Sequence, residues 1–313
     1  MKLRTDRKIT DILAEKPFTF SAEFIPPRNG ESLESLFKKV DLLKQAGVDF
    51  VSVTKGAGGS LRGGTLPISF LIKEDYQIPV IAHFTCMESS FQAIENTLLD
   101  HAYLGIVNIL ALRGDPPTGV FSTYHASQDQ HSYAHQLIHQ INELAHGKYL
   151  LREGFDQNEK DLHQGQPLDF CIGAAAYPEP EDISVDVSAD YFVLKVKEGA
   201  TYGITQMTYS PGNYQAFVRK VSDRGYELPI LPGIRLLSSL KQAEFLMKTF
   251  HTKIPQDYLQ ILKEERPSLN KAYIRNLILD FRSRGAQGVQ FFIMNEADIL
   301  AELVSETRDM IGD

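Results

Sequence analysis

Cysteine is scarce in this sequence of 313 residues, which contains only Cys86 and Cys171, far apart and outside any CxxC spacing. This scarcity excludes a disulfide framework and a cysteine-based metal site. Neither HExxH nor HxH occurs, so the sequence predicts no metal centre. A reducing cytoplasm is therefore the expected location.

Long apolar runs and an excess of positive charge are also missing. The first residues, MKLRTDRKITDILAEK, carry charge throughout and lack the hydrophobic region of a secretory signal. No stretch approaches the roughly 20 apolar residues that cross a bilayer. The net charge of −8 argues against nucleic acid or an anionic membrane as the main partner. We expect a soluble cytosolic protein, and a homo-oligomer is possible.

Two nucleotide-binding signatures are absent as well. No GxGxxG follows the first predicted strand, which disfavours an open doubly wound sheet with a dinucleotide site. The glycine-rich segment 56–64 lacks the GK[ST] ending of a phosphate-binding loop. A flexible turn explains most of its glycines better than a phosphate-binding loop does.

What the sequence does contain is a regular alternation of short apolar segments with amphipathic ones. FTFSAEF at 18–24 has apolar residues at every second position, which is typical of a strand. Residues 32–47 have helical spacing between a serine start signal and a glycine stop. Eight strand–helix units follow in this way, the count of a single-domain (β/α)8 TIM barrel over 1–313. The strands are expected at 18–24, 50–54, 80–86, 108–112, 170–178, 202–207, 228–234 and 289–294.

Three regions extend this basic pattern. Residues 1–16 form an N-terminal helical segment, and extra helices are expected near 256–263 and 269–285. The longest extension, 116–168, contains one convincing helix at Ser132–Ala145 and a polar stretch. We interpret it as a long barrel loop after strand four and not as a domain boundary, because the alternation resumes at once.

The fourth strand runs without a spacer into Arg113, Gly114 and Asp115 in the segment NILALRGDPPTG. A parallel strand that ends this way delivers polar groups to the C-terminal edge of the sheet, where α/β enzymes have their sites. A solvated turn is the alternative for this segment alone, because turns are rich in Gly, Asp and Pro.

Other strand ends also carry polar side chains that we expect to converge on one rim. With the phenylalanines of 18–24 facing the helices, Glu23 points inward, and the same parity places Thr54 beside Ser52 and His83 beside Thr85. Taken singly, Glu23 could belong to a structural ion pair and His83 could be a core histidine. Their joint occurrence favours a functional site. The rim set is Glu23, Thr54, His83, Arg113, Asp115, Tyr177, Gln206, Pro232, Gly233 and Asn295.

Seven ordered blocks carry a family resemblance: AEFIPPR at 22–28, FVSVT at 50–54, AHFTC at 82–86, NILALRGDPP at 108–117, AAYPE at 175–179, GITQM at 203–207 and LPGI at 231–234. In order and spacing they resemble the methylenetetrahydrofolate reductase family along essentially the whole chain. That family folds as a (β/α)8 barrel holding a flavin, usually FAD. It reduces 5,10-methylenetetrahydrofolate to 5-methyltetrahydrofolate with reduced nicotinamide, in one-carbon metabolism and methionine biosynthesis.

The resemblance also implies residue roles. Glu23 would be the general acid that protonates the folate, and Asp115 would lie by the flavin and folate and stabilise the developing cation. Gln206 would contact the pterin or the nicotinamide, which occupy one flavin face in turn. Burial against Phe and Pro neighbours would raise the pKa of Glu23 toward neutrality. The implied flavin shell is Thr54, His83, Arg113, Gly114, Asp115, Tyr177 and Lys195.

The chain departs from the family pattern after the AAYPE block. PEPEDISVD lacks the histidine that members usually have there, and in SADYFVLKVKEG only Lys195 aligns, with Asp190 out of register. Where the family often places a stacking aromatic, this chain has Phe245 and Leu246, with Leu246 the better aligned. FMN, weakly held FAD, or a flavin supplied within a complex are therefore alternatives to tightly bound FAD.

Two functional alternatives to a self-sufficient reductase follow. The chain could be the catalytic subunit of a larger reductase that receives electrons from a partner protein, or a folate-binding subunit without catalysis. Glu23 and Asp115 argue against the second alternative, because simple binding has less need of a buried acid. The sequence does not discriminate NADH from NADPH, since it contains no Rossmann acidic residue or arginine to distinguish them.

Overall fold

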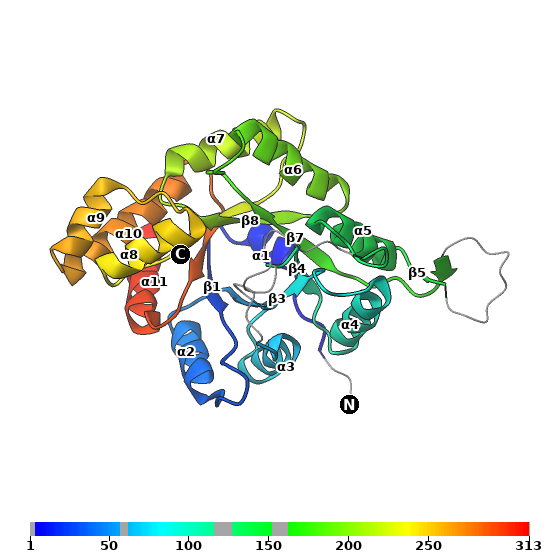
Figure 1. Ribbon diagram of the computed structural model, residues 1–313. Helices are drawn as coiled ribbons and strands as arrows, with labels where there is room; N and C mark the ends of the chain where they lie inside the picture. The colour runs from blue at the N-terminus through cyan, green and yellow to red at the C-terminus, as the bar shows by residue number, and fades with distance from the viewer. Residues whose placement is uncertain (1–3, 57–61, 116–126, 152–161, 313) are drawn as a thin grey trace.

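Eight parallel strands close into a barrel in the computed structural model, which describes residues 4–56, 62–115, 127–151 and 162–312. The order around the barrel is β1-β10-β9-β8-β7-β4-β3-β2 (Figure 1). This confirms the (β/α)8 architecture expected from the sequence. The strands are β1 (Thr19–Phe24), β2 (Phe50–Val53), β3 (Val80–Thr85), β4 (Asn108–Leu112), β7 (Cys171–Ala176), β8 (Tyr202–Met207), β9 (Ile230–Ile234) and β10 (Gly288–Phe292).

Helices surround this barrel (Figure 1). Two of them, α9 (Gln256–Lys263) and α10 (Pro267–Ser283), occupy the two extra regions expected before the last strand. No helix in the described part of the chain is both long and apolar enough to cross a membrane. The others in the ring are α2 (Glu34–Gln45), α3 (Thr65–Leu71) with the π-helix η2 (Ile72–Tyr76), α4 (Phe91–Tyr103), α5 (Ala134–Ala145), α6 (Val185–Lys197), α7 (Pro211–Ser222), α8 (Leu240–Phe250) and α11 (Ala297–Ile311).

Strand alternation divides the apolar residues into two clusters. The larger lies between the barrel and its helices and includes Phe18, Phe20, Ala22 and Phe24, as the period-two pattern predicts. The smaller lies inside the barrel. It consists of Ile9, Ile12, Leu13, Phe50, Ile81, Leu110, Cys171, Tyr202, Ile204 and Leu231.

Helix α1 (Ile9–Glu15) closes the N-terminal end of the barrel, and Figure 1 shows it at the centre of the ring. Asn108, at the start of β4 and fully buried, holds it there. Its side-chain oxygen accepts a hydrogen bond from the backbone N–H of Ile9 at 3.0 Å, and its side-chain nitrogen donates to the carbonyl of Arg7 at 2.9 Å. The buried amide therefore satisfies a free N–H at the beginning of the helix.

A buried polar network crosses the barrel interior closer to its C-terminal end. The side chain of Gln290 on β10 accepts a hydrogen bond from the hydroxyl of Ser21 on β1 at 2.5 Å and donates to the hydroxyl of Ser52 on β2 at 2.9 Å. All three side chains are fully buried. This network ties β10, β1 and β2 together directly beneath the C-terminal mouth of the barrel.

The region between β4 and β7 differs in part from the expected long loop. It contains the predicted helix as α5, but also a two-stranded antiparallel sheet, β5 (Lys148–Leu150) with β6 (Leu162–Gln164), that the sequence did not predict. Helix α6 begins at Val185, where the Ser184 hydroxyl caps it by accepting a hydrogen bond from the N–H of Val187. Residues 116–126 and 152–161 of the expected insertion, and 57–61 of the glycine-rich segment, lie outside the described residues.

Replacing the capping amide tests how far α1 depends on it. We expect Asn108→Ala to lower the free energy of unfolding by about 2 kcal/mol, because the N–H of Ile9 becomes a buried donor without an acceptor. Urea denaturation measures this change. Asn96→Ala, on the exposed face of α4, is the matched control and should change stability by less than about 0.5 kcal/mol. Equal effects of the two substitutions would contradict the capping role.

Candidate active site

Two ionisable side chains meet at the mouth of the barrel. Glu23 comes from β1 and His83 from β3, and the alternation that sends the phenylalanines outward turns both inward. Glu23 Oε2 lies 3.4 Å from His83 Nε2, and the two side chains are 14% and 7% exposed. His83 Nε2 is buried and makes no hydrogen bond within the described residues.

Burial determines the charge of this pair. It raises the pKa of Glu23 to about 8 and lowers the pKa of His83 to about 3, because desolvation penalises the charged form of each group. At neutral pH both side chains are therefore uncharged, and their contact is not an ion pair. A pKa of about 8 keeps most of the Glu23 carboxyl protonated at neutral pH, which is the form a general acid requires.

A second buried group, Lys195, reaches the rim from α6. Its ammonium donates a hydrogen bond to the carbonyl of Ala175 at 2.8 Å and lies 5.5 Å from the ring centroid of Tyr177. Burial lowers the pKa of Lys195 to about 8. Tyr177 itself is 46% exposed and presents its ring at the end of β7. The lysine and the tyrosine therefore form one unit on this side of the mouth.

The segment after β4 lies beside that unit. Gly114 has a φ of +92°, and a Cβ there would lie 3.1 Å from Cβ of Thr85, so the turn requires glycine. Arg113 and Asp115 are exposed, and both act on Tyr177 through their charges. Desolvation of the Tyr177 hydroxyl raises its pKa, the Asp115 carboxylate raises that pKa further, and the Arg113 guanidinium lowers it.

On the adjacent strand β8, Gln206 lines a pocket of about 140 Å³ together with Tyr177, Glu179 and Phe250. Its side-chain oxygen accepts a hydrogen bond from the N–H of Met207 at 2.9 Å. Next to it, Gly233 on β9 leaves room for the ring of Phe292, because a Cβ there would lie 2.3 Å from that ring. Phe292 was not expected at the site, because its position in the apolar run VQFFIM resembles a core residue.

The aligned position for a stacking aromatic is occupied by a core residue. Leu246 lies on the buried face of α8 and is fully buried, so it presents no surface on which a ligand could stack. Its neighbour Phe245 is 55% exposed and packs edge to face against Phe250, at a centroid distance of 6.1 Å.

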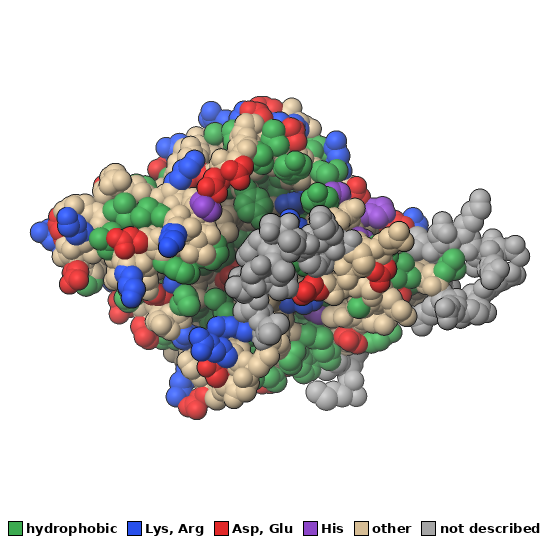
Figure 2. Space-filling view, in the orientation of Figure 1, with side chains coloured by type: hydrophobic (Ala, Val, Ile, Leu, Met, Phe, Trp, Pro, Cys, Tyr) green, Lys and Arg blue, Asp and Glu red, His purple; other side chains and the backbone are tan. Residues whose placement is uncertain are grey.

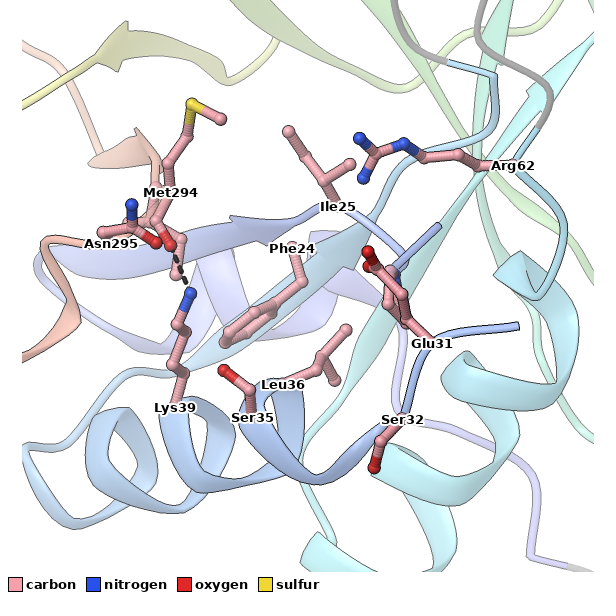
Figure 3. A pocket seen from close by; sticks show the side chains of 12 residues that line it. Phe24, Ile25, Glu31, Ser32, Ser35, Leu36, Lys39, Arg62, Met294 and Asn295 are labelled. Carbon is pink, nitrogen blue, oxygen red and sulfur yellow. Dashed lines mark hydrogen bonds between the residues drawn. The ribbon is translucent and has the colours of Figure 1, made fainter. Parts of the chain in front are cut away.

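Asn295 lies in a different place from the rest of the predicted rim set. It lines a pocket of about 290 Å³ beside the ends of β1 and β10, and neither Glu23 nor His83 lines that pocket. Figure 3 shows Lys39 and Arg62 on opposite sides of it. Lys39 donates to the carbonyl of Met294, and Arg62 donates to the carbonyl of Pro26 at 2.9 Å. This pocket therefore flanks the mouth.

The rim consequently has two adjoining halves. Thr54, His83, Arg113 with Asp115, and Tyr177 end the neighbouring strands β2, β3, β4 and β7, while Glu23 and Gln206 lie on the half formed by β1, β10, β9 and β8. Figure 2, drawn in the orientation of Figure 1, shows hydrophobic side chains interspersed with charged ones on this face.

Within the described residues, no three His, Cys, Asp or Glu side chains could hold a metal ion.

The raised pKa of Glu23 predicts a pH-dependent stability. Between its unfolded value near 4.5 and its folded value of about 8, the folded protein holds a proton that the unfolded chain has released. Stabilisation is therefore lost as pH rises through this window. Between about pH 6.5 and 7.5, the unfolding free energy of the parent should fall relative to Glu23→Gln by about 1.4 kcal/mol per pH unit. The unfolded His83, with its ordinary pKa of 6.5, is partly protonated at the lower end of this range, but the parent and Glu23→Gln share this contribution, so it cancels in the comparison.

Urea denaturation across this range at fixed ionic strength measures the difference. Parallel stability curves for the parent and Glu23→Gln would show that Glu23 is ionised in the folded protein, and they would contradict the assignment of a neutral acid.

Comparisons with known proteins agree with this geometry. The family model described as methylenetetrahydrofolate reductase matches residues 8–308. Methylenetetrahydrofolate reductase 1 of Schizosaccharomyces pombe is 31% identical over 302 residues, covering 92% of this chain and 46% of the yeast protein. The 5,10-methylenetetrahydrofolate reductase of Escherichia coli is 28% identical over 287 residues, covering 89% of this chain and 87% of the bacterial protein.

A solved structure shows the same fold. It is described as an uncharacterized protein from Clostridium thermocellum that binds two copies of 5-methyl-5,6,7,8-tetrahydrofolic acid, and it superposes with a TM-score of 0.59 at 16% identity, covering 96% of this chain and 97% of its own. The chain spans about half the length of the yeast relative and most of the bacterial one. The family match extends over nearly all described residues, and this chain belongs to the methylenetetrahydrofolate reductase family.

Proposed function

We propose that this chain reduces 5,10-methylenetetrahydrofolate to 5-methyltetrahydrofolate, using a bound flavin and electrons from a reduced nicotinamide. One observation carries the proposal: the carboxyl group of Glu23 is withdrawn from water at the mouth of a barrel, 3.4 Å from His83, and this burial raises its pKa to about 8. A binding protein without catalysis gains nothing from a desolvated acid, whereas protonation of a folate nitrogen requires one. The E. coli relative that carries this activity in its name supports the same conclusion.

The half-rim of β2, β3, β4 and β7 fits a flat heterocycle with polar edges. The Thr54 hydroxyl and His83 Nε2 are buried polar atoms without a hydrogen-bond partner in the described chain. Such atoms are costly unless a ligand pairs with them. Tyr177 supplies an exposed ring, and Gly114 allows the backbone close to Thr85. We assign the flavin to this half-rim, held by Thr54, His83, Arg113, Gly114, Asp115, Tyr177 and Lys195.

When bound, the flavin would supply hydride transfer between the nicotinamide and the folate. The protein's own contributions are acid, charge and position. Glu23 protonates the folate nitrogen, and the Asp115 carboxylate stabilises the positive charge that develops on the folate. Gln206 orients the ring that would stack on the flavin. His83, neutral at 3.4 Å from Glu23, leaves the acid without a cation that would ionise it.

The hold on the outer part of the flavin is weaker than the family pattern provides. Asp190 is 62% exposed and forms an ion pair with Arg224 at 2.6 Å, so its carboxylate is engaged at the surface between α6 and α7. Leu246 is buried. These two observations support FMN or weakly held FAD. They also favour a second candidate function, a catalytic subunit that receives flavin or electrons within a complex.

Glu23→Gln separates the two halves of the proposed reaction. We expect it to reduce folate turnover by about 10²- to 10⁴-fold, because the amide cannot donate the proton. Reduction of the flavin by the nicotinamide should change little, since that step needs no acid from the protein. Glu302→Gln, exposed on α11, is the matched control. Parent-like turnover by Glu23→Gln in stopped-flow and steady-state assays would remove Glu23 as the acid.

The electron donor can be identified by its effect on flavin absorbance. The purified or flavin-reconstituted protein should be yellow, and anaerobic titration with NADH or NADPH alone should bleach it. A flavoprotein that neither nicotinamide bleaches would point to a partner protein as donor. A protein that stays colourless in excess FAD and FMN would contradict the flavin assignment itself.

A further inference from the structure

Arg235 is a buried cation for which the described part of the chain supplies no carboxylate partner. It follows β9 directly, and only 8% of the residue is exposed. Its Nε atom is buried and has no hydrogen-bond partner within the described residues, and its charge acts on the nearby Tyr209 hydroxyl. Its backbone carbonyl, by contrast, accepts a hydrogen bond from the Tyr209 hydroxyl at 2.7 Å, so the main chain at this position is fixed.

Such an arrangement is expensive in an isolated chain. Arginine does not deprotonate in proteins, so burial cannot be relieved by loss of charge. A buried charge without a counterion destabilises the fold. Other arginines of this protein behave as expected: Arg224 pairs with Asp190, and Arg308 with the buried Asp49. Arg235 therefore calls for an anionic partner that the described chain does not supply.

The strand register places the backbone of Arg235 level with that of Glu23, two strands away. Glu23 on β1 is paired with Phe292 on β10, and Phe291 is paired with Ile234 on β9. Arg235, one residue further, is thus level with Phe292 and Glu23. Adjacent strands lie about 4.8 Å apart, so the backbones of Glu23 and Arg235 are separated by about 10 Å.

Continued one residue past the end of β9 at Ile234, the strand alternation indicates an inward position for Arg235. Leu231 belongs to the cluster inside the barrel, whereas Ile230 and Ile234 belong to the outer cluster. Arg235 has the parity of Leu231. It lies on the half-rim of Glu23 and Gln206, across the barrel from the strands assigned to the flavin.

The chemistry of the proposed reaction limits what Arg235 can bind. A guanidinium near the pterin ring would oppose the positive charge that Asp115 is assigned to stabilise, unless a negative group of the ligand neutralises it. Carboxylates and phosphates match the planar guanidinium fork in two parallel hydrogen bonds. We propose that Arg235 binds an oxyanion of the ligand that enters this half-rim, and this rests on the proposed function. The source is either a glutamyl carboxylate of the folate or a phosphate of the nicotinamide dinucleotide.

Isothermal titration of the full chain with four ligands distinguishes these sources. 5-Methyltetrahydrofolate and NADH carry the oxyanions, while 6-methyltetrahydropterin and reduced nicotinamide riboside lack them. We expect Arg235→Met to weaken one of the first pair by about 10- to 100-fold, the loss of a charged hydrogen bond, and to leave the corresponding analogue unchanged. Arg235→Lys should recover part of the affinity. Lys241→Met, which removes an exposed cation on α8, should leave all four unchanged.

A second measurement separates binding from a structural role. Because Arg235→Met removes an unpaired buried charge, the melting temperature of the ligand-free protein should stay the same or rise. A large fall in melting temperature together with unchanged affinity for 5-methyltetrahydrofolate and NADH would overturn the proposal, as would equal weakening of the analogues without oxyanions. If the parent chain binds none of the four ligands, the proposed function itself fails, and the Arg235 assignment fails with it.

Discussion

The hydrogen bonds of Gln290 determine the geometry on which the mouth of the barrel depends. This buried amide joins Ser21 and Ser52, and so it links the last strand to the first two. A slip of one residue between these strands would leave buried polar groups unpaired and would turn the phenylalanines of β1 into the barrel. The register that results pairs Glu23 with Phe292 and brings His83 within contact of the acid.

Desolvation is the common property of the groups at this end. Glu23, His83, Lys195 and Arg235 are all largely withdrawn from water, and three of them have strongly displaced pKa values as a result. Each costs folding free energy. The large cluster between strands and helices can offset that cost. Apolar packing between the strands and the helices therefore provides most of the stability. The destabilising, desolvated ionisable groups lie at the rim, as is common in catalytic sites.

Sequence periodicity was sufficient for the parts of the fold that repeat. The strands at 108–112 and 202–207 have the predicted bounds. In the first of them, the apolar run that follows Asn108 ends directly at Arg113. The hairpin of β5 and β6 escaped prediction, since strands of three residues show no measurable alternation. Arg235 escaped as well, because burial of a single cation after a strand depends on residues distant in sequence. Leu246 shows the converse: alignment suggested contact with a ligand, and packing buried it.

The plug that α1 forms in the barrel has a kinetic consequence. With Ile9, Ile12 and Leu13 filling the floor, whatever reaches Glu23 arrives from the opposite end and must leave the same way. Two reactants that need the same place above the acid would then exclude one another, and each would wait for its predecessor to depart. A barrel that is closed at one end favours binding of the donor and the acceptor in turn over binding of both at once.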